Sequence, residues 1–284
     1  DRTSNTTMFA SYVYGEYLRS TNSGTSWTAI NTGLPFGGGG GEEWLCAWHQ
    51  DPTTATTLYA GGRTALYRST NSGTSWSALG SPTGSGNILE FVIAPSNNQI
   101  IYAIKSGTNA VSKSTNGGTS FTAVSTGLPT GVAPTSVTVS NTDANIVFVT
   151  YSGYSAANKV YKSTNGGTSW ISISAGLPNI PVNTIVFQNG SSNDAVYIGT
   201  DVGVYYKDNS TAWIAFNTGL PNVSVRDLEI YYPTSRLRCA TFGRGTWDSD
   251  LYSAVAAPPV ASFTASATTI CVGQTVPFTN TSSG

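Results

Sequence analysis

A small set of carboxylates is the part of this sequence that could perform acid–base chemistry. The chain has 284 residues, and only 14 of them are Asp or Glu. A glycoside hydrolase needs two carboxyl groups roughly 5–10 Å apart, one of them kept protonated by its surroundings. The candidates lie near the ends of segments that we expect to be inner strands: Glu42, Glu43, Glu90, Asp227 and Glu229. If the chain is a hydrolase, Glu43 and Asp227 are the predicted pair.

Glu90 differs from the other candidates because it lies within an apolar segment, residues 88–94. Burial in such a strand would raise the pKa of its carboxyl group. A solvent-facing or paired glutamate is the commoner arrangement in proteins, so both interpretations stay open.

Other catalytic groups have less support in the sequence. The single histidine, His49, has no serine or cysteine partner at a spacing that would indicate a catalytic triad. The three cysteines, Cys46, Cys239 and Cys271, form no Cys-x-x-Cys or Cys/His pattern typical of zinc sites. We therefore expect no metal and no cofactor, and we expect Cys46 and Cys239 to be buried free thiols.

The composition excludes several classes of partner. Charged residues make up only 10% of the chain and its net charge is −1, so no basic stripe is present to neutralise nucleic-acid phosphates. No apolar run reaches the length of a membrane-spanning helix. A surface of Gly, Ser, Thr and Asn is typical of secreted all-β proteins, so we expect a secreted or cell-surface location.

A repeated eight-residue segment must position these side chains, because the chain returns to it at a nearly constant interval. It ends in an aromatic residue at positions 27, 76, 121 and 170, and a degraded copy ends at 213. The complete copies occupy residues 20–27, 69–76, 114–121 and 163–170, and the degraded copy occupies residues 208–213. Such an interval indicates one supersecondary unit repeated along the chain.

Each copy has the residues of a tight turn between two strands. Asn22 can bond to backbone donors two residues on, and Gly24 can adopt a positive φ without steric cost. Trp27 begins the next strand and can cover its neighbour as a large apolar plug. We expect these residues to be structural rather than ligand-binding. The structural set is Asn22, Trp27, Asn71, Trp76, Asn116, Phe121, Asn165, Trp170 and Trp213.

The segment resembles the Asp-box, or BNR repeat, of β-propellers of the sortilin and xyloglucanase type. The resemblance implies that each copy joins the third and fourth strands of a propeller blade, on the face away from the active site. Asn22 and its equivalents stand where the family has aspartate. Asparagine can make the same turn bonds, so the fold inference holds, but a carboxylate metal site in the box is excluded.

The strands expected between the boxes define an all-β propeller over residues 1–254. Counting gives three strands, then four repeats of four, then three, or about six repeats in all. Either the two ends pair to complete one blade, or further blades precede Asp1, and we favour the second. Continuous apolar runs such as Ile88–Leu89 and residues 91–93 predict inner strands that are buried on both faces.

The composition changes after residue 254. Residues 255–260 include Ala257-Pro258-Pro259 and are typical of a linker. Residues 261–284 alternate in polarity and resemble the start of a PKD domain, a β-sandwich module. The combination resembles large secreted proteins of gliding-type bacteria, so we expect the chain to be one part of a longer protein.

The face opposite the boxes gathers the second-to-third-strand loops and the connectors between blades. Aromatic and charged residues there would form a platform for a polysaccharide or a surface protein. The predicted ligand-binding residues are Glu42, Glu43, Trp44, Arg63, Tyr151, Tyr154, Asp201 and Arg244.

Two functional classes follow from these observations. One is a non-catalytic propeller for adhesion, glycan binding or protein binding. The other is a glycoside hydrolase fragment that resembles xyloglucanases or sialidases. The sialidase resemblance implies arginines from several blades, whereas the clustered ones all fall in the last repeat: Arg226, Arg236, Arg238 and Arg244. Xyloglucan hydrolases place their cleft between two propellers, and one is visible here.

Overall fold

The computed structural model describes residues 1, 3–35, 46–107, 111–155, 157–253, 262–269 and 271–282. The chain divides into two compact units, Asp1–Asp250 and Leu251–Gly284. Strands dominate the described part of the first unit, and its one helical element is the 3₁₀ turn Val13–Gly15. None of the described helices is long and apolar enough to cross a membrane.

The second unit is a short antiparallel ribbon. Its strands are β23 (Phe263–Ala265) and β24 (Phe278–Asn280), and Phe263 stacks edge-on against Phe278 with 5.4 Å between ring centroids. Both rings remain largely exposed. The predicted linker, residues 255–260, lies outside the described residues.

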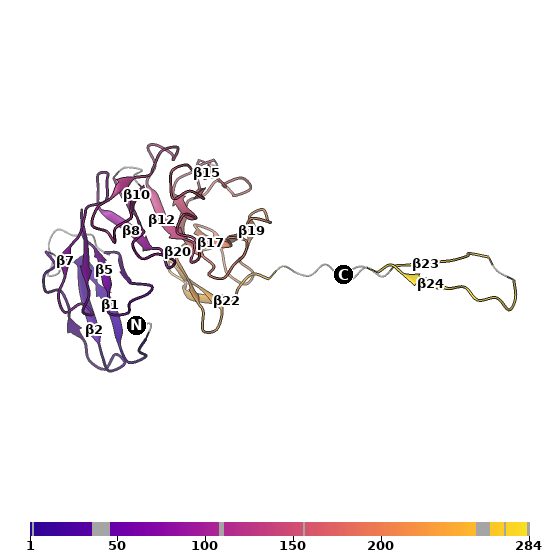
Figure 1. The fold of residues 1–284 in the computed structure, drawn as a ribbon, viewed down its shortest axis with the longest axis horizontal. Coiled ribbons are helices and arrows are strands. Elements are labelled where there is room, and N and C mark those ends of the chain that lie inside the picture. The colour runs from indigo at the N-terminus through magenta and orange to yellow at the C-terminus, as the bar shows by residue number, and fades with distance from the viewer. Residues whose placement is uncertain are drawn as a thin grey trace. The chain divides into compact units, whose positions relative to one another are not determined.

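The first unit is a β-propeller of six blades, each an antiparallel sheet (Figure 1). The first blade has three strands: β1 (Met8–Tyr12), β2 (Glu16–Ser20) and β3 (Thr28–Ala29). The second and third blades have four strands each: β4 (Trp48–Gln50), β5 (Leu58–Gly61), β6 (Leu66–Ser69), β7 (Ser77–Ala78), β8 (Ile88–Ile93), β9 (Ile101–Lys105), β10 (Val111–Ser114) and β11 (Thr122–Ala123).

The remaining blades continue the same order. The fourth and fifth have four strands each: β12 (Pro134–Val139), β13 (Val147–Tyr151), β14 (Val160–Ser163), β15 (Ile171–Ser172), β16 (Val182–Phe187), β17 (Val196–Thr200), β18 (Gly203–Lys207) and β19 (Ile214–Ala215). The sixth has β20 (Val225–Tyr231), β21 (Arg236–Thr241) and β22 (Gly245–Asp250). The predicted propeller class and the predicted strand count are both confirmed.

The two three-stranded blades are incomplete at opposite edges. The box lies between β2 and β3, so the first blade contains the second, third and fourth strands of the repeat. The sixth blade contains the first three. No strand of one pairs with a strand of the other within the described residues, so the alternative in which the ends complete a single blade is not observed.

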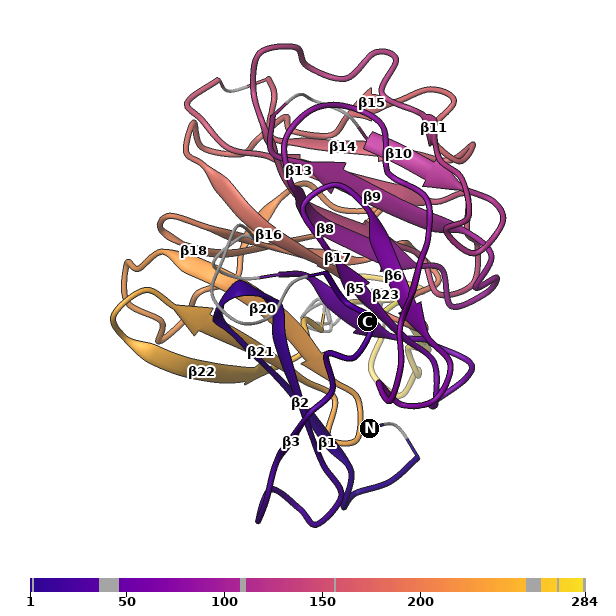
Figure 2. The ribbon, with the colours of Figure 1, turned by 90° about the vertical axis from the view of Figure 1, so that its left-hand side faces the viewer.

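Neighbouring blades pack through their inner strands, in the order β4, β8, β12, β16 and β20. In Figure 2 the inner strands β8, β16 and β20 lie toward the middle of the view, and the outer strands β11, β18 and β22 lie farther out. Four of these inner strands shift register at the same place, after their first residue. Such β-bulges change the direction in which side chains point. Here they set which side chains face the central channel, the space that the inner strands of successive blades line.

Burial differs between the first and second strand of a blade. All five residues of β9 are buried, as are all five of β13 and of β17. In β8, by contrast, Leu89 is 38% exposed and Val92 is half-buried. The expectation that the inner strand is buried on both faces is therefore wrong. The second strand is covered by blades on both sides, whereas the inner strand turns one face to the channel.

The box residues make the predicted turn bonds. In the first copy, Ser20 Oγ donates to Asn22 Oδ1 at 2.9 Å, and the N–H groups of Gly24 and Ser26 donate to Ser20 Oγ and Asn22 Oδ1, each at 2.9 Å. Equivalent bonds occur in the copies that begin at residues 69, 114 and 163. The turn is thus closed by its own side chains.

The box tryptophans connect one blade to the blade before it. Trp76 Nε1 donates to Ile30 O at 2.6 Å, and Trp213 Nε1 donates to Ile173 O at 2.6 Å. Trp27 is the exception, since its indole bonds to Gly24 O in its own turn and it is 40% exposed. The expected apolar plug therefore does not form in the first blade, where the described structure contains no preceding blade.

Candidate functional site

The inner strands present side chains to the channel in three tiers that follow from strand register. The upper tier is Cys46, Leu89, Thr135, Asn183 and Arg226, of which the last four are the bulge residues of their strands. The middle tier is Ala47, Glu90, Ser136, Thr184 and Asp227. The lower tier, toward the box face, is His49, Val92, Thr138, Val186 and Glu229.

The upper and middle tiers line an open cavity of about 350 Å³, which we call the channel cavity. Its wall is mainly polar, with hydroxyl, amide and carboxyl groups from successive blades. The lower tier and its neighbours line a further space of about 490 Å³. Both volumes fall in the range of small-molecule sites.

Polar groups of the channel cavity join each blade to the next. Glu90 Oε2 accepts the backbone N–H of Val137 at 3.0 Å, and Ser136 Oγ accepts that of Ile185 at 3.3 Å. In the upper tier, Thr135 Oγ1 donates to Val182 O at 2.8 Å. The cavity wall is therefore held in place by bonds between blades, which pre-orders it for a ligand.

Two carboxyl groups share the channel cavity, and the pKa of each is raised. Burial raises the pKa of Glu90 to about 7, and the negative charge of Asp227 adds to the effect, although bonds from Ser136 and Val137 oppose it. Burial also raises the pKa of Asp227, opposed by the N–H of Leu228. Glu90 therefore changes charge near neutral pH, where it can donate or accept a hydrogen bond.

The mouth of the cavity, between the fifth and sixth blades, carries a second group of side chains, which we call the mouth cluster. Arg226 lies over the ring of Phe242, with 5.6 Å between the guanidinium carbon and the ring centroid, and Phe242 is 73% exposed. Asp201 Oδ1 accepts bonds from Asn183 Nδ2 at 3.0 Å and from Ser224 Oγ at 2.9 Å. Phe242 and Asp201 thus each contact a side chain that lines the cavity, Arg226 and Asn183 respectively.

The structure brings some of the predicted site residues together. Asp227 lies in the channel cavity, where its neighbouring carboxylate is Glu90 and not the predicted partner Glu43, and Asp201 belongs to the mouth cluster. Arg244 lies in the turn that carries Phe242. Glu42, Glu43 and Trp44 lie outside the described residues.

Other predicted residues lie apart from this site. Arg63 Nε donates to Asn87 Oδ1 at 3.4 Å in the loops of the second and third blades. Tyr154 is 72% exposed in the loop between β13 and β14. Neither lines the channel cavity.

Tyr151 is not on the surface, so the expectation that it forms part of an exposed aromatic platform is wrong. Its side chain is fully buried in the core of the third and fourth blades, edge-on to Tyr161 with 5.7 Å between ring centroids. Burial raises the pKa of its hydroxyl, which has no hydrogen-bond partner among the described residues. The reason is that β13 is a second strand, covered on both faces.

Phe242, Arg226 and Asn183 were not predicted from the sequence as a group. Each of the four bulged inner strands carries its bulge residue one position before the middle-tier residue, and this spacing is visible once the repeats are aligned on their boxes. Phe242 is harder to recognise from the sequence. It is a single apolar residue beside Gly243 in a turn, so no strand pattern shows where its side chain lies.

The fold and this cavity define the class: a β-propeller whose inner strands line a polar cavity. A family model described as "Sortilin, neurotensin receptor 3" (Sortilin-Vps10) matches residues 64–228, which is more than half of the chain. The chain therefore belongs to the Sortilin-Vps10 family. None of the curated proteins compared with it matches significantly.

Solved structures share the fold. The GH74 xyloglucanase from Xanthomonas campestris is 19% identical with a TM-score of 0.66, and the match covers 89% of this chain and 44% of that one. An ancestral GH74 enzyme is 16% identical with a TM-score of 0.67, over 88% of this chain and 38% of that one. The chain thus spans about two fifths of the length of these two proteins.

A smaller propeller also matches. The structure titled "YCF48 bound to D1 peptide" is 13% identical with a TM-score of 0.59, and the match covers 87% of this chain and 75% of that one. At these identities the likenesses show the fold, and they leave the ligand of this chain to be argued from its own residues.

Proposed function

We propose that this propeller is a binding module that takes up a glycan or an extended peptide at the mouth of its channel and does not turn it over. The observation that carries the proposal is the pre-ordered polar wall of the channel cavity beside an exposed aromatic ring, Phe242. Hydroxyl and amide groups match the hydrogen bonds of sugars and peptides, and a ring face can stack on either.

Two comparisons support binding without catalysis. The family model carries the name of a receptor, and one structural neighbour is a propeller bound to a peptide. The low charge of the chain and its Gly, Ser, Thr and Asn content support a secreted or cell-surface location. In this proposal the propeller serves adhesion as one module of a longer extracellular protein, and residues 261–284 begin a β-sandwich module.

Glycoside hydrolysis is the second candidate, because Glu90 and Asp227 share one cavity and both have raised pKa values. The neighbouring GH74 structures favour the same possibility. One observation opposes hydrolysis: the carboxyl group of Glu90 already accepts the backbone N–H of Val137, so one of its oxygens has a structural role. Such chemistry requires two carboxyl groups that flank the reacting bond, one as general acid and the other as base or nucleophile.

The test is to incubate the chain with xyloglucan, β-glucan and sialylated glycans while measuring binding by calorimetry and product by chromatography. We expect saturable binding to one of these, weakened at least tenfold by Phe242→Ala, and no product. Tyr154→Ala is the matched control, because Tyr154 is equally exposed but lies outside the mouth cluster. Product that disappears in Glu90→Gln and Asp227→Asn, with folding intact, would establish the hydrolase instead.

A further inference from the structure

At three places in the described residues, the tryptophan of a box fills a space between its own blade and the preceding blade, which we call a socket. In each copy the indole N–H donates to a carbonyl of the preceding blade at 2.6–2.7 Å: Trp76 to Ile30, Trp170 to Val124 and Trp213 to Ile173. The connector leucines pack in the same clusters as the tryptophans. Leu128 lies with Trp170 and Leu177 lies with Trp213, and both leucines are less than 10% exposed.

The tryptophan of each filled socket is followed at once by a two-residue fourth strand. Ile171 and Ser172 of β15 pair with Lys162 and Tyr161 of β14, and β7 and β19 pair with their third strands in the same register. The aromatic side chain and the added strand are therefore parts of one unit: the indole fills the socket while the next two residues extend the sheet.

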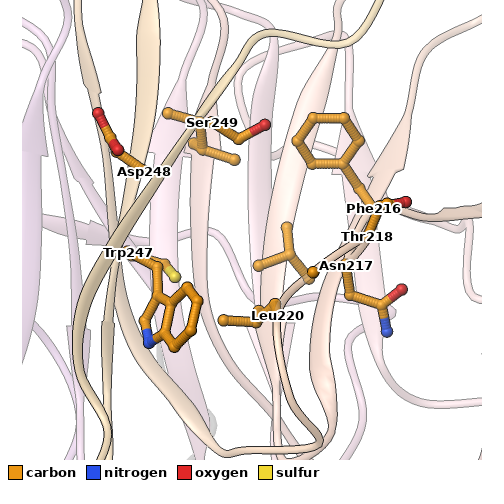
Figure 3. A pocket seen from close by; sticks show the side chains of 11 residues that line it. Phe216, Asn217, Thr218, Leu220, Trp247, Asp248 and Ser249 are labelled. Atoms are coloured by element: carbon orange, nitrogen blue, oxygen red, sulfur yellow. The ribbon is translucent and has the colours of Figure 1, made fainter.

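A fourth socket is present at the sixth blade without a tryptophan. The connector of the fifth blade, residues 216–220, has the residue order of the filled copies. Between it and β21–β22 lies a cavity of about 310 Å³, which we call the edge socket. Figure 3 shows Leu220 and Trp247 pointing toward one another across it. Leu220 is half-buried, as is Leu34 beside Trp76, whereas Leu128 and Leu177 are buried.

The strand beside the edge socket is open to pairing. All six residues of β22 are exposed, and the described part of the sixth blade has no fourth strand. By register with the fourth and fifth blades, Trp247 and Asp248 occupy the positions that pair with a fourth strand. An exposed edge without lysine or proline is a ready template for another strand.

The charges at this edge specify the chemistry of the added strand. Arg236 forms ion pairs with both Asp248 and Asp250, each at 2.7 Å, so one cation serves two carboxylates. Asp250 is 88% exposed and Asp248 is 48% exposed. The excess negative charge favours a cationic side chain directly opposite Asp248, since opposite charges on facing strands attract.

We propose that the edge of the sixth blade binds an extended segment of another polypeptide that contains tryptophan followed immediately by lysine or arginine. The indole fills the edge socket against Leu220 and the connector. The basic residue pairs with Asp248 and the residue after it pairs with Trp247, so that the segment becomes the missing fourth strand. This surface is separate from the channel cavity and from the mouth cluster.

The probe is a synthetic peptide with the sequence of residues 163–173 carrying Ile171→Lys, titrated into the full chain by calorimetry. We expect saturable one-to-one binding that weakens at least tenfold when Trp170 of the peptide is replaced by alanine, and several-fold when its lysine is replaced by glutamate. In the protein, Leu220→Asp should abolish binding, while Tyr154→Ala, at an exposed residue that does not line the edge socket, should leave it unchanged. Equal binding by the alanine peptide would overturn the proposal.

A charge-reversal variant of the protein distinguishes a loss of specific contacts from simple misfolding. Asp248→Lys should prefer the glutamate peptide to the lysine peptide, a gain that unfolding cannot produce. No binding of any peptide to the folded chain, or no reversal of preference, would refute the segment chemistry. Sedimentation that shows self-association lost in Leu220→Asp, without peptide binding, would assign this edge to a second copy of the chain and overturn the proposal.

Discussion

The indole N–H of Trp170 donates to the carbonyl oxygen of Val124 at 2.7 Å, across the boundary between the third and fourth blades. The two residues are 46 positions apart, so the bond connects consecutive repeats rather than residues within one turn. Because Trp76 and Trp213 make the same bond, the box acts on its neighbour as well as on its own hairpin. Stability should therefore depend on the box aromatic most where a preceding blade receives it.

Trp170→Phe tests this dependence directly. The change removes the inter-blade hydrogen bond and part of a buried ring, and should lower the free energy of unfolding by roughly 1–3 kcal/mol. Trp27→Phe is the control, since Trp27 bonds within its own turn and is 40% exposed. Its effect should stay within about 0.5 kcal/mol. Equal losses in urea denaturation would show that the inter-blade bond contributes nothing particular.

Ser72 gives a second prediction, because it adopts a left-handed conformation with φ 55°. The matching positions in the next two boxes are Gly117 and Gly166, with φ 65° and 69°. A left-handed serine costs about 1–2 kcal/mol, and glycine loses about 0.5–1 kcal/mol more entropy on folding. Ser72→Gly should therefore raise stability by roughly 0.5 kcal/mol, while Gly117→Ser should lower it. Opposite shifts in melting temperature would contradict the assignment of strain.

Tyr151 and Tyr102 form a matched pair for the third prediction. Both side chains are fully buried, but Tyr102 Oη donates to Ala144 O at 2.8 Å, whereas Tyr151 Oη has no partner among the described residues. An unsatisfied buried hydroxyl costs about 1–3 kcal/mol, and a satisfied one contributes about 1 kcal/mol. Tyr151→Phe should thus be neutral or stabilising in chemical denaturation, and Tyr102→Phe destabilising. A clear loss in Tyr151→Phe would reveal a partner for its hydroxyl.

The blades could be predicted from the sequence because the bonds of each box join residues that are close together in the chain. The turn of each box depends on Ser20, Asn22, Gly24 and their equivalents, which lie within a few residues of one another. A recurring short segment therefore predicts a recurring hairpin, and the strand count follows from the spacing. The inter-blade bond of the tryptophans was not predicted, because its acceptor lies in a different repeat.

The candidate site was only partly predictable, since it depends on register and on the bulges. Ser136 is an ordinary polar residue in the sequence, and only the register shift after Pro134 turns it to the channel. Tyr151 illustrates the opposite error: a tyrosine at a strand end gives no sign of which blade covers it. Glu90 could be named because a carboxylate in an apolar segment is conspicuous, and Asp227 because it falls in an expected inner strand.

Glu90 makes the stability of the protein depend on pH. Its pKa is raised from 4.5 to about 7, so the folded state holds a proton that the unfolded state has lost between these values. Stability should accordingly fall as pH rises from about 4.5 to 7 and then level off, with a total loss of roughly 1–3 kcal/mol. The sign is opposite to that of a salt-bridged carboxylate, whose stabilisation is lost as pH falls.

Glu90→Gln should remove most of this pH dependence, because glutamine can still accept the N–H of Val137 but does not titrate. Asp227→Asn should shift the transition to lower pH, since it removes the charge that helps to raise the pKa of Glu90. Melting temperatures of the three proteins between pH 4 and pH 8 measure both effects. A wild-type curve that rises through this range, or one that Glu90→Gln leaves unchanged, would show that Glu90 is charged in the folded channel at neutral pH.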